Sequence, residues 1–303
     1  TPSRRRRRTP LTWLRGGGLW NLAFLAPMLI VFGVFSWGPI ARSVIMSFQK
    51  TNLISEPVWV GLDNFARVLA DPNLGTAVVN TLYFAGLALV FGFPLPIIMA
   101  VLMSEVRRGK GLYSALAYLR RGAARRRGAA VEGLLQREPR RRLQHDPRLG
   151  RRPAAAWLQS QATAMPSLVI EATWAAAGGS IIIYLAALIA VPPELYDAAE
   201  VDGAGIWRKI WHVTLPQLRG ILFIMLILQV IGTAQVFLEP YLFTGGGPNN
   251  ATLTVLLLIY RYAFQNSLGG AYGEATALSL MLAVFLGLLS WLYFKLTDRW
   301  STN

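Results

Sequence analysis

The 303-residue chain contains no cysteine and only two histidines, His145 and His212. Without cysteine there is no disulfide framework, no thiolate metal site and no cysteine nucleophile, and the two histidines argue against a histidine-based metal centre. The chain also has no Gly-rich phosphate loop followed by Gly-Lys-Ser or Gly-Lys-Thr, so it cannot hydrolyse a nucleotide by that route. These absences exclude most thiol, metal and nucleotide chemistry.

Charged residues are also scarce: they make up 15% of the chain, against 54% hydrophobic residues. Five apolar segments each have the roughly 17 to 25 residues that a helix needs to cross a bilayer. They are Leu19–Pro39, Thr81–Met103, Leu168–Val191, Leu218–Leu238 and Ala275–Leu296. Because polar and apolar positions do not alternate along them, the sequence predicts an all-α, polytopic transmembrane helix bundle over residues 19–297. A basic tail at 1–18 precedes it, and a short tail at 298–303 follows it.

The distribution of Lys and Arg predicts the orientation, because these residues gather in short cytoplasmic loops. Basic residues flank both ends of the chain and the loop at 192–216: Arg4–Arg8, Arg15, Arg208, Lys209, Arg219, Lys295 and Arg299. Both termini and that loop are therefore predicted to be cytoplasmic, in a multi-pass protein of the inner or plasma membrane. The chain must then cross the membrane an even number of times between Lys110 and Glu194, yet only one apolar span is visible there. Six spans are expected, and the third is missing.

The interval 120–153 falls where the third span is expected. It is rich in Arg, Ala, Gly and Pro, and twelve arginines lie between Arg120 and Arg152. One interpretation is a disordered basic arm, which makes the chain a membrane-anchored protein that binds nucleic acid or anionic lipid headgroups. The other is a pair of compensating frameshifts in the gene, because a one-base shift allows residues 122–130 to encode an apolar segment. Sequencing the coding DNA and translating both frames distinguishes the two.

The loop at 192–216 is a polar insert between two apolar segments. Pro192, Pro193 and Glu194 favour a helix start, and the chain has no helix breaker from Leu195 until Asp202-Gly203, where it can turn sharply. A second short helix is expected from Ile206 to His212. Two short helices with small residues on one face can dock into a groove on a partner protein.

The spacing within this loop resembles the cytoplasmic signature of the permease subunits of binding-protein-dependent ABC importers. That signature is Glu-Ala-Ala, three residues, Gly, nine residues, Ile, one residue and Leu-Pro. The matching residues are Asp197, Ala198, Ala199, Gly203, Val213, Leu215 and Pro216, with Asp for Glu and Val for Ile as the two departures. The resemblance implies that these residues couple the chain to a separate ATP-binding subunit, and that the chain itself is no enzyme and binds no cofactor.

Two further stretches are similar to permeases of the carbohydrate branch, which includes the maltose and glycerol-3-phosphate systems. They are Tyr241–Thr252, with its Thr-Gly-Gly-Gly-Pro run, and Gly61–Phe65. The resemblance implies a sugar or sugar-like solute, a second permease subunit and an extracytoplasmic solute-binding protein, and it implies no nucleic-acid partner.

Polar residues within an apolar span are candidates for the solute path, because a sugar needs hydrogen-bond partners near the membrane midplane. Gln229, Thr233 and Gln235 lie on the segment Leu218–Leu238, and Tyr241 follows near its outer end. The alternative is that these side chains hydrogen-bond neighbouring helices.

Overall fold

The computed structural model describes residues 19–105, 157–265 and 271–301 of the chain. Five helical stretches in these ranges are long and apolar enough to cross a membrane: Ala23–Ser47, Pro72–Ser104, Gln161–Ile189, Ile206–Ala234 and Tyr272–Thr297. The predicted all-α, polytopic class is therefore confirmed. The predicted third span in 120–153 lies outside the described residues.

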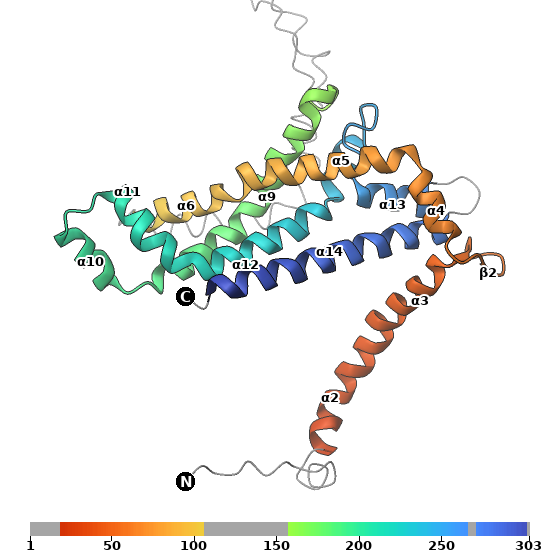
Figure 1. Cartoon of the computed structure of the whole chain (residues 1–303), viewed down its shortest axis with the longest axis horizontal. Helices are drawn as coiled ribbons and strands as arrows, with labels where there is room; N and C mark the ends of the chain where they lie inside the picture. Colours follow the sequence, from red (N-terminus) through yellow and green to blue (C-terminus); the bar gives the residue numbers. More distant parts are fainter. Residues whose placement is uncertain (1–18, 106–156, 266–270, 302–303) are drawn as a thin grey trace, which may run out of the picture.

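The spans combine α-helical and π-helical (η) segments, with short elements between them (Figure 1). In chain order the described elements are α2 (Leu19–Phe32), η2 (Gly33–Trp37), α3 (Gly38–Ser47), β1 (Gln49–Lys50), β2 (Val58–Trp59), α4 (Asp63–Ala70), α5 (Pro72–Leu87), η3 (Ala88–Gly92), α6 (Pro94–Glu105), α9 (Gln161–Ile189), α10 (Pro193–Val201), α11 (Ile206–Lys209), η4 (Ile210–Thr214), α12 (Leu215–Ala234), η5 (Pro240–Thr244), α13 (Val255–Phe264) and α14 (Tyr272–Ser301).

The helix boundaries differ from the predicted apolar segments at several ends. The second helix begins at Pro72 rather than Thr81, because the Asp71 side chain caps it by accepting a hydrogen bond from the Asn73 amide at 2.8 Å. The helix predicted to end at Leu238 ends at Ala234. Apolar runs locate the part of a helix that lies in lipid, whereas capping residues determine where the helix starts and stops.

The span Pro72–Ser104, which α5, η3 and α6 form, runs parallel to α9. Phe84 of α5 shares a buried cluster with Met165 near the start of α9. Ala100 of α6 shares another with Tyr184 near the end of α9. This parallel course agrees with the even number of membrane crossings that the charge distribution requires between Lys110 and Glu194.

The two ends of the bundle differ in character (Figure 1). One end carries α10 and α11 together with the C-terminal end of α14, and the other carries α4, α13 and the two-stranded β1–β2 ribbon. At the ribbon end the buried Asn64 side chain donates to the carbonyl oxygens of Ser47 at 2.8 Å and Gln49 at 2.9 Å. An ion pair of 3.0 Å joins Arg67 of α4 to Glu274 of α14. These contacts tie the end of the first span to the start of the last.

A second polar contact at this end joins the start of α5 to α13. The hydroxyl of Tyr262 donates to the Asp71 carboxylate. Desolvation alone would raise the pKa of Asp71, but the hydrogen bonds from Tyr262 and Asn73 outweigh it and hold this pKa below its usual 3.8. The folded state therefore favours the ionised carboxylate.

The Asp71–Tyr262 contact should contribute to stability in a pH-dependent way. Because the folded-state pKa is lowered, its contribution is present above pH 3.8 and is lost as the pH falls through the folded pKa. Asp71→Asn keeps a capping side chain but loses the charge, and we expect it to lower the unfolding free energy by about 1.5–3 kcal/mol at pH 7. Thermal melts of Asp71→Asn, Tyr262→Phe and the double variant in detergent measure the coupling. Additive effects of the two substitutions would contradict the assignment.

Candidate functional site

The loop at 192–216, called the coupling loop below, begins with helix α10. Pro193 occupies the first turn, Glu194 lies at the positive end of the helix dipole, and no residue of α10 is buried. The helix ends at Val201, and Gly203 follows with a φ of +70°, the left-handed conformation that glycine adopts without steric cost. The predicted helix and turn are therefore both present.

The second part of the coupling loop differs from the prediction. A separate short helix was expected from Ile206 to His212, but α11 continues through the π-helical segment η4 into the membrane span α12, so that Ile206–Ala234 is one helical stretch. The sequence does not reveal this continuity, because Pro216 lies within the stretch, just after η4, and a proline normally marks a helix boundary.

Two contacts hold α10 against the start of this long helix. The hydroxyl groups of Tyr196 and Thr214 are 3.2 Å apart, and Lys209 forms an ion pair of 3.3 Å with Glu200. The apolar side chains of Val201 and Trp207 remain 88% and 74% exposed. Helix α10 is thus braced to the long helix Ile206–Ala234, and the loop presents exposed apolar side chains at its end.

The seven motif residues are grouped on this loop. Asp197, Ala198, Gly203 and Pro216 are exposed, and Ala199, Val213 and Leu215 are partly buried. The structure therefore brings the whole motif into one projecting segment and leaves its small residues accessible.

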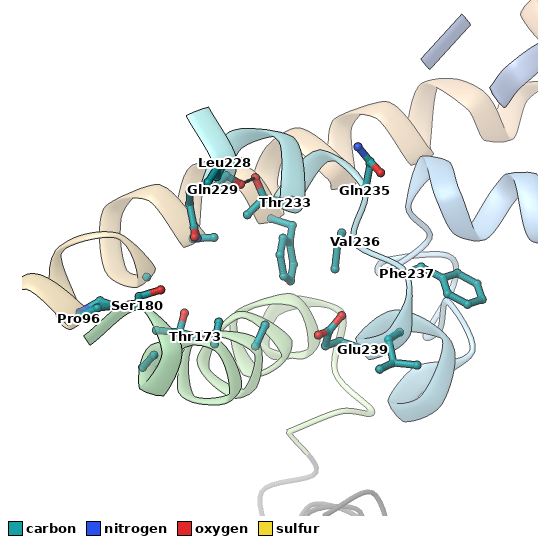
Figure 2. A pocket seen from close by; sticks show the side chains of 18 residues that line it. Pro96, Thr173, Ser180, Leu228, Gln229, Thr233, Gln235, Val236, Phe237 and Glu239 are labelled. Carbon is teal, nitrogen blue, oxygen red and sulfur yellow. Dashed lines mark hydrogen bonds between the residues drawn. The ribbon is translucent and has the colours of Figure 1, made fainter. Parts of the chain in front are cut away.

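A cavity of about 410 Å³ lies between α9, α12 and the α5–η3–α6 helix. Gln229, Thr233 and Gln235 line it together with Thr173 and Ser180 of α9 (Figure 2). Thr233 donates its hydroxyl hydrogen to the Gln229 carbonyl oxygen at 2.9 Å, within its own helix, so its oxygen still has acceptor capacity. Three of the four predicted path residues thus lie around one space.

Gly92 of η3 shapes the wall of this cavity. A Cβ atom placed on Gly92 would lie 3.0 Å from Oγ1 of Thr173 and 3.4 Å from Nε2 of Gln229. The absence of a side chain at this position lets α9 and α12 present both polar groups next to η3.

The family profile of the binding-protein-dependent transport system inner membrane component matches residues 68–301 of the chain. The chain belongs to this family. The arabinooligosaccharides transport system permease protein AraP of Halalkalibacterium halodurans is 32% identical, over 91% of this chain and 88% of its own. The multiple sugar-binding transport system permease protein MsmF of Streptococcus mutans is 29% identical, over 92% of this chain and 96% of its own.

A solved structure of similar fold is that of a bacterial alginate ABC transporter in complex with alginate pentasaccharide-bound periplasmic protein. One of its chains has a TM-score of 0.75 and 26% identity, with 95% of this chain and 97% of that chain covered. The predicted resemblance to the carbohydrate branch is confirmed. The protein is a permease subunit of a carbohydrate-uptake ABC importer in the inner membrane, it is not an enzyme, and ATP binding resides in a separate ATPase.

Tyr241 of the permease lies apart from the other predicted path residues. Its ring stacks on Phe237 with a centroid distance of 5.1 Å, and its hydroxyl oxygen is 3.1 Å from that of Tyr260. Phe264 and Tyr272 extend this row of aromatic rings. Tyr241 therefore belongs to an aromatic cluster at the η5–α13 corner.

The Gly-rich run of the permease is a structural turn. Gly245 and Gly246 have φ angles of +60° and +93°. The Arg261 guanidinium donates to the Gly245 carbonyl oxygen at 2.8 Å and to Oδ1 of Asn250 at 2.9 Å, and a Cβ on Gly246 would lie 2.5 Å from it. Glycine is favoured at both positions because residues with a side chain rarely adopt these positive φ angles.

Sequence reasoning missed three polar residues of the cavity. Thr173 and Ser180 lie within the predicted apolar segment Leu168–Val191, where composition does not set them apart from packing residues, and Glu239 directly follows the predicted segment Leu218–Leu238. A spacing of seven residues, which places Thr173 and Ser180 on one helix face, is the signal that could have found the first two.

Proposed function

We propose that the permease forms one part of a transmembrane path for an oligosaccharide and receives mechanical work through the coupling loop. The observation that carries the proposal is the cavity between α9, α12 and η3, whose polar side chains lie on helices long enough to span the bilayer. Polar side chains within the membrane cost free energy and usually mark a functional site, so a path for a hydroxyl-rich solute accounts for their presence. The relatives that transport arabinooligosaccharides and multiple sugars support this solute class.

We propose further that the ATPase subunit docks on the coupling loop at the cytoplasmic face. The exposed surface of α10 and the brace between Tyr196 and Thr214 support this role, because a lever must be rigid and accessible. Movement of α10 would pass through its contacts with Thr214 and Lys209 into the continuous stretch Ile206–Ala234. The later part of that stretch, α12, carries Gln229 and Thr233 at the cavity. Closure of the ATPase pair would then switch the bundle between inward-open and outward-open states.

The remaining partners follow from the same proposal. A second permease subunit would complete the path, and a solute-binding protein would deliver the oligosaccharide at the opposite end, where α4, α13 and the β1–β2 ribbon lie (Figure 1). Both termini would be cytoplasmic. The end of α14 lies at the same end of the bundle as α10 and α11, which supports this orientation for the C-terminus (Figure 1).

Reconstitution of the importer in proteoliposomes tests the function. With the ATPase, both permeases and the binding protein present, uptake of a labelled oligosaccharide should require ATP inside the vesicles and the binding protein outside. Uptake that continues without ATP would refute an ABC importer and indicate a channel.

The cavity assignment predicts a selective effect at Gln229. Replacement of Gln229 by Leu removes a hydrogen-bonding group that faces the cavity and should slow oligosaccharide uptake about tenfold, the effect of roughly 1.4 kcal/mol. Gln265→Leu, at the exposed end of α13, is the matched control and should leave uptake unchanged. Both variants should still bind the ATPase. Equal uptake by the Gln229 variant and the control would show that the cavity is not the path.

A further inference from the structure

Glu239 contributes a carboxylate to the cavity wall. It follows the end of α12 and directly precedes Pro240 of η5, and Figure 2 shows its carboxylate directed toward the space between α9 and α12. The ion pairs in the described part of the chain are Arg67–Glu274 and Lys209–Glu200. Within those described ranges Glu239 has neither an ion pair nor a hydrogen bond, so its oxygens are available to a solute.

No cation balances this carboxylate in the wall formed by the described residues. The remaining lining residues are apolar or neutral and polar, and none of them is Lys, Arg or His. Because the dielectric constant inside a protein is lower than that of water, the field of the unpaired Glu239 charge is only weakly screened. The cavity therefore carries a negative potential where a solute would pass.

We infer that Glu239 is a specificity-determining residue that admits neutral sugars and excludes sugars bearing carboxylates. An ionised carboxylate accepts up to about four hydrogen bonds, and these match the hydroxyl donors of a neutral sugar. A sugar with a carboxylate, such as a uronate, would bring a second negative charge into a cavity whose wall offers it no cation. Its carboxylate and that of Glu239 would repel each other. This selectivity rests on the proposed function of the cavity as the solute path.

The cysteine-free sequence allows a direct measurement of the potential. In the assembled importer in proteoliposomes, Ser180→Cys places a thiol in the cavity wall. The thiol is modified with a cationic, an anionic or a neutral methanethiosulfonate, and mass spectrometry of this chain gives each modification rate. Each rate is then divided by the rate at which the same reagent modifies a free thiol in solution. The cationic reagent should react about tenfold faster than the anionic one, and Glu239→Gln should lower this ratio at least about threefold. Glu56→Gln, at the ribbon end of the bundle, is the matched control and should not change the ratio.

Competition with sugars tests the selectivity itself. Trigalacturonate should slow modification by the neutral reagent at least about threefold more in the Glu239→Gln background than with Glu239 present, whereas maltotriose should slow it no more in that background than with Glu239 present. An unchanged cation-to-anion ratio, or equal effects of trigalacturonate in both backgrounds, would overturn the inference while leaving the path intact. A thiol that the neutral reagent cannot reach would overturn both the inference and the proposed path.

Discussion

Replacement of Ala198 by Arg is expected to abolish ATP-driven uptake while the permease still inserts into the membrane. Ala198 is exposed on α10, which buries none of its residues within this chain, so the substitution costs the permease itself little. At a helix-in-groove interface, however, the long charged side chain would be buried without a partner, at about 3–5 kcal/mol. We therefore expect at least about a 100-fold loss of ATPase binding.

Copurification of the ATPase subunit and vesicle uptake measure this effect. Ala198→Ser keeps the residue small and should retain both activities. Normal uptake by the Arg variant would refute the coupling role of the loop.

Substitution of Gly203 by Val should uncouple ATP hydrolysis from solute uptake without preventing ATPase binding. Gly203 has a φ of +70°, and a β-branched residue in this conformation is strained by roughly 1–2 kcal/mol. Relief of the strain would reorient α10 relative to α11, so the ATPase could still bind while hydrolysis no longer drives uptake. Gly205→Ala is the control in the same loop, because Gly205 has a φ of −67° and no atom within 4 Å of a new Cβ. An effect of Gly205→Ala as large as that of Gly203→Val would contradict the conformational explanation.

The second large effect is expected at Gly273, in the first turns of α14. A Cβ atom there would collide with the backbone oxygen of Gln49 and would lie 2.6 Å from Nδ2 of Asn64. Because a backbone atom cannot move aside as a side chain can, Gly273→Ala should lower the unfolding free energy by about 3 kcal/mol. It would also break the buried hydrogen bonds of Asn64 that join the first span to α4.

Thermal unfolding of the purified permease in detergent, followed by tryptophan fluorescence, measures this loss. Gly287→Ala provides a matched control in the same helix, since nothing lies within 4 Å of its new Cβ. Alanine also favours a helix over glycine by about 1 kcal/mol, so the control should be neutral or slightly stabilising. Equal melting temperatures for the two variants would show that the ribbon end does not pack as described.

The all-α class, the five long spans and the motif of the coupling loop were predictable from the sequence. Long apolar runs and a motif of fixed spacing are local properties of the sequence, so they can be recognised without knowledge of the fold. The predictions failed at helix boundaries, as at Pro72, where the Asp71 cap starts the helix before the apolar segment begins, and at His212, where a predicted helix end is the middle of a continuous helix.

The candidate path shows the same division. Gln229 and Thr233 are polar residues within an apolar segment, and composition alone singles them out. The sequence by itself thus determined that the protein spans a membrane and carries residues at the spacing typical of ABC-importer permeases, because hydrophobicity and residue spacing can be read directly from the chain. Only the tertiary structure decided that Thr173, Ser180 and Glu239 face the same cavity as Gln229 while Tyr241 does not, because the direction in which a side chain points depends on how separate helices pack.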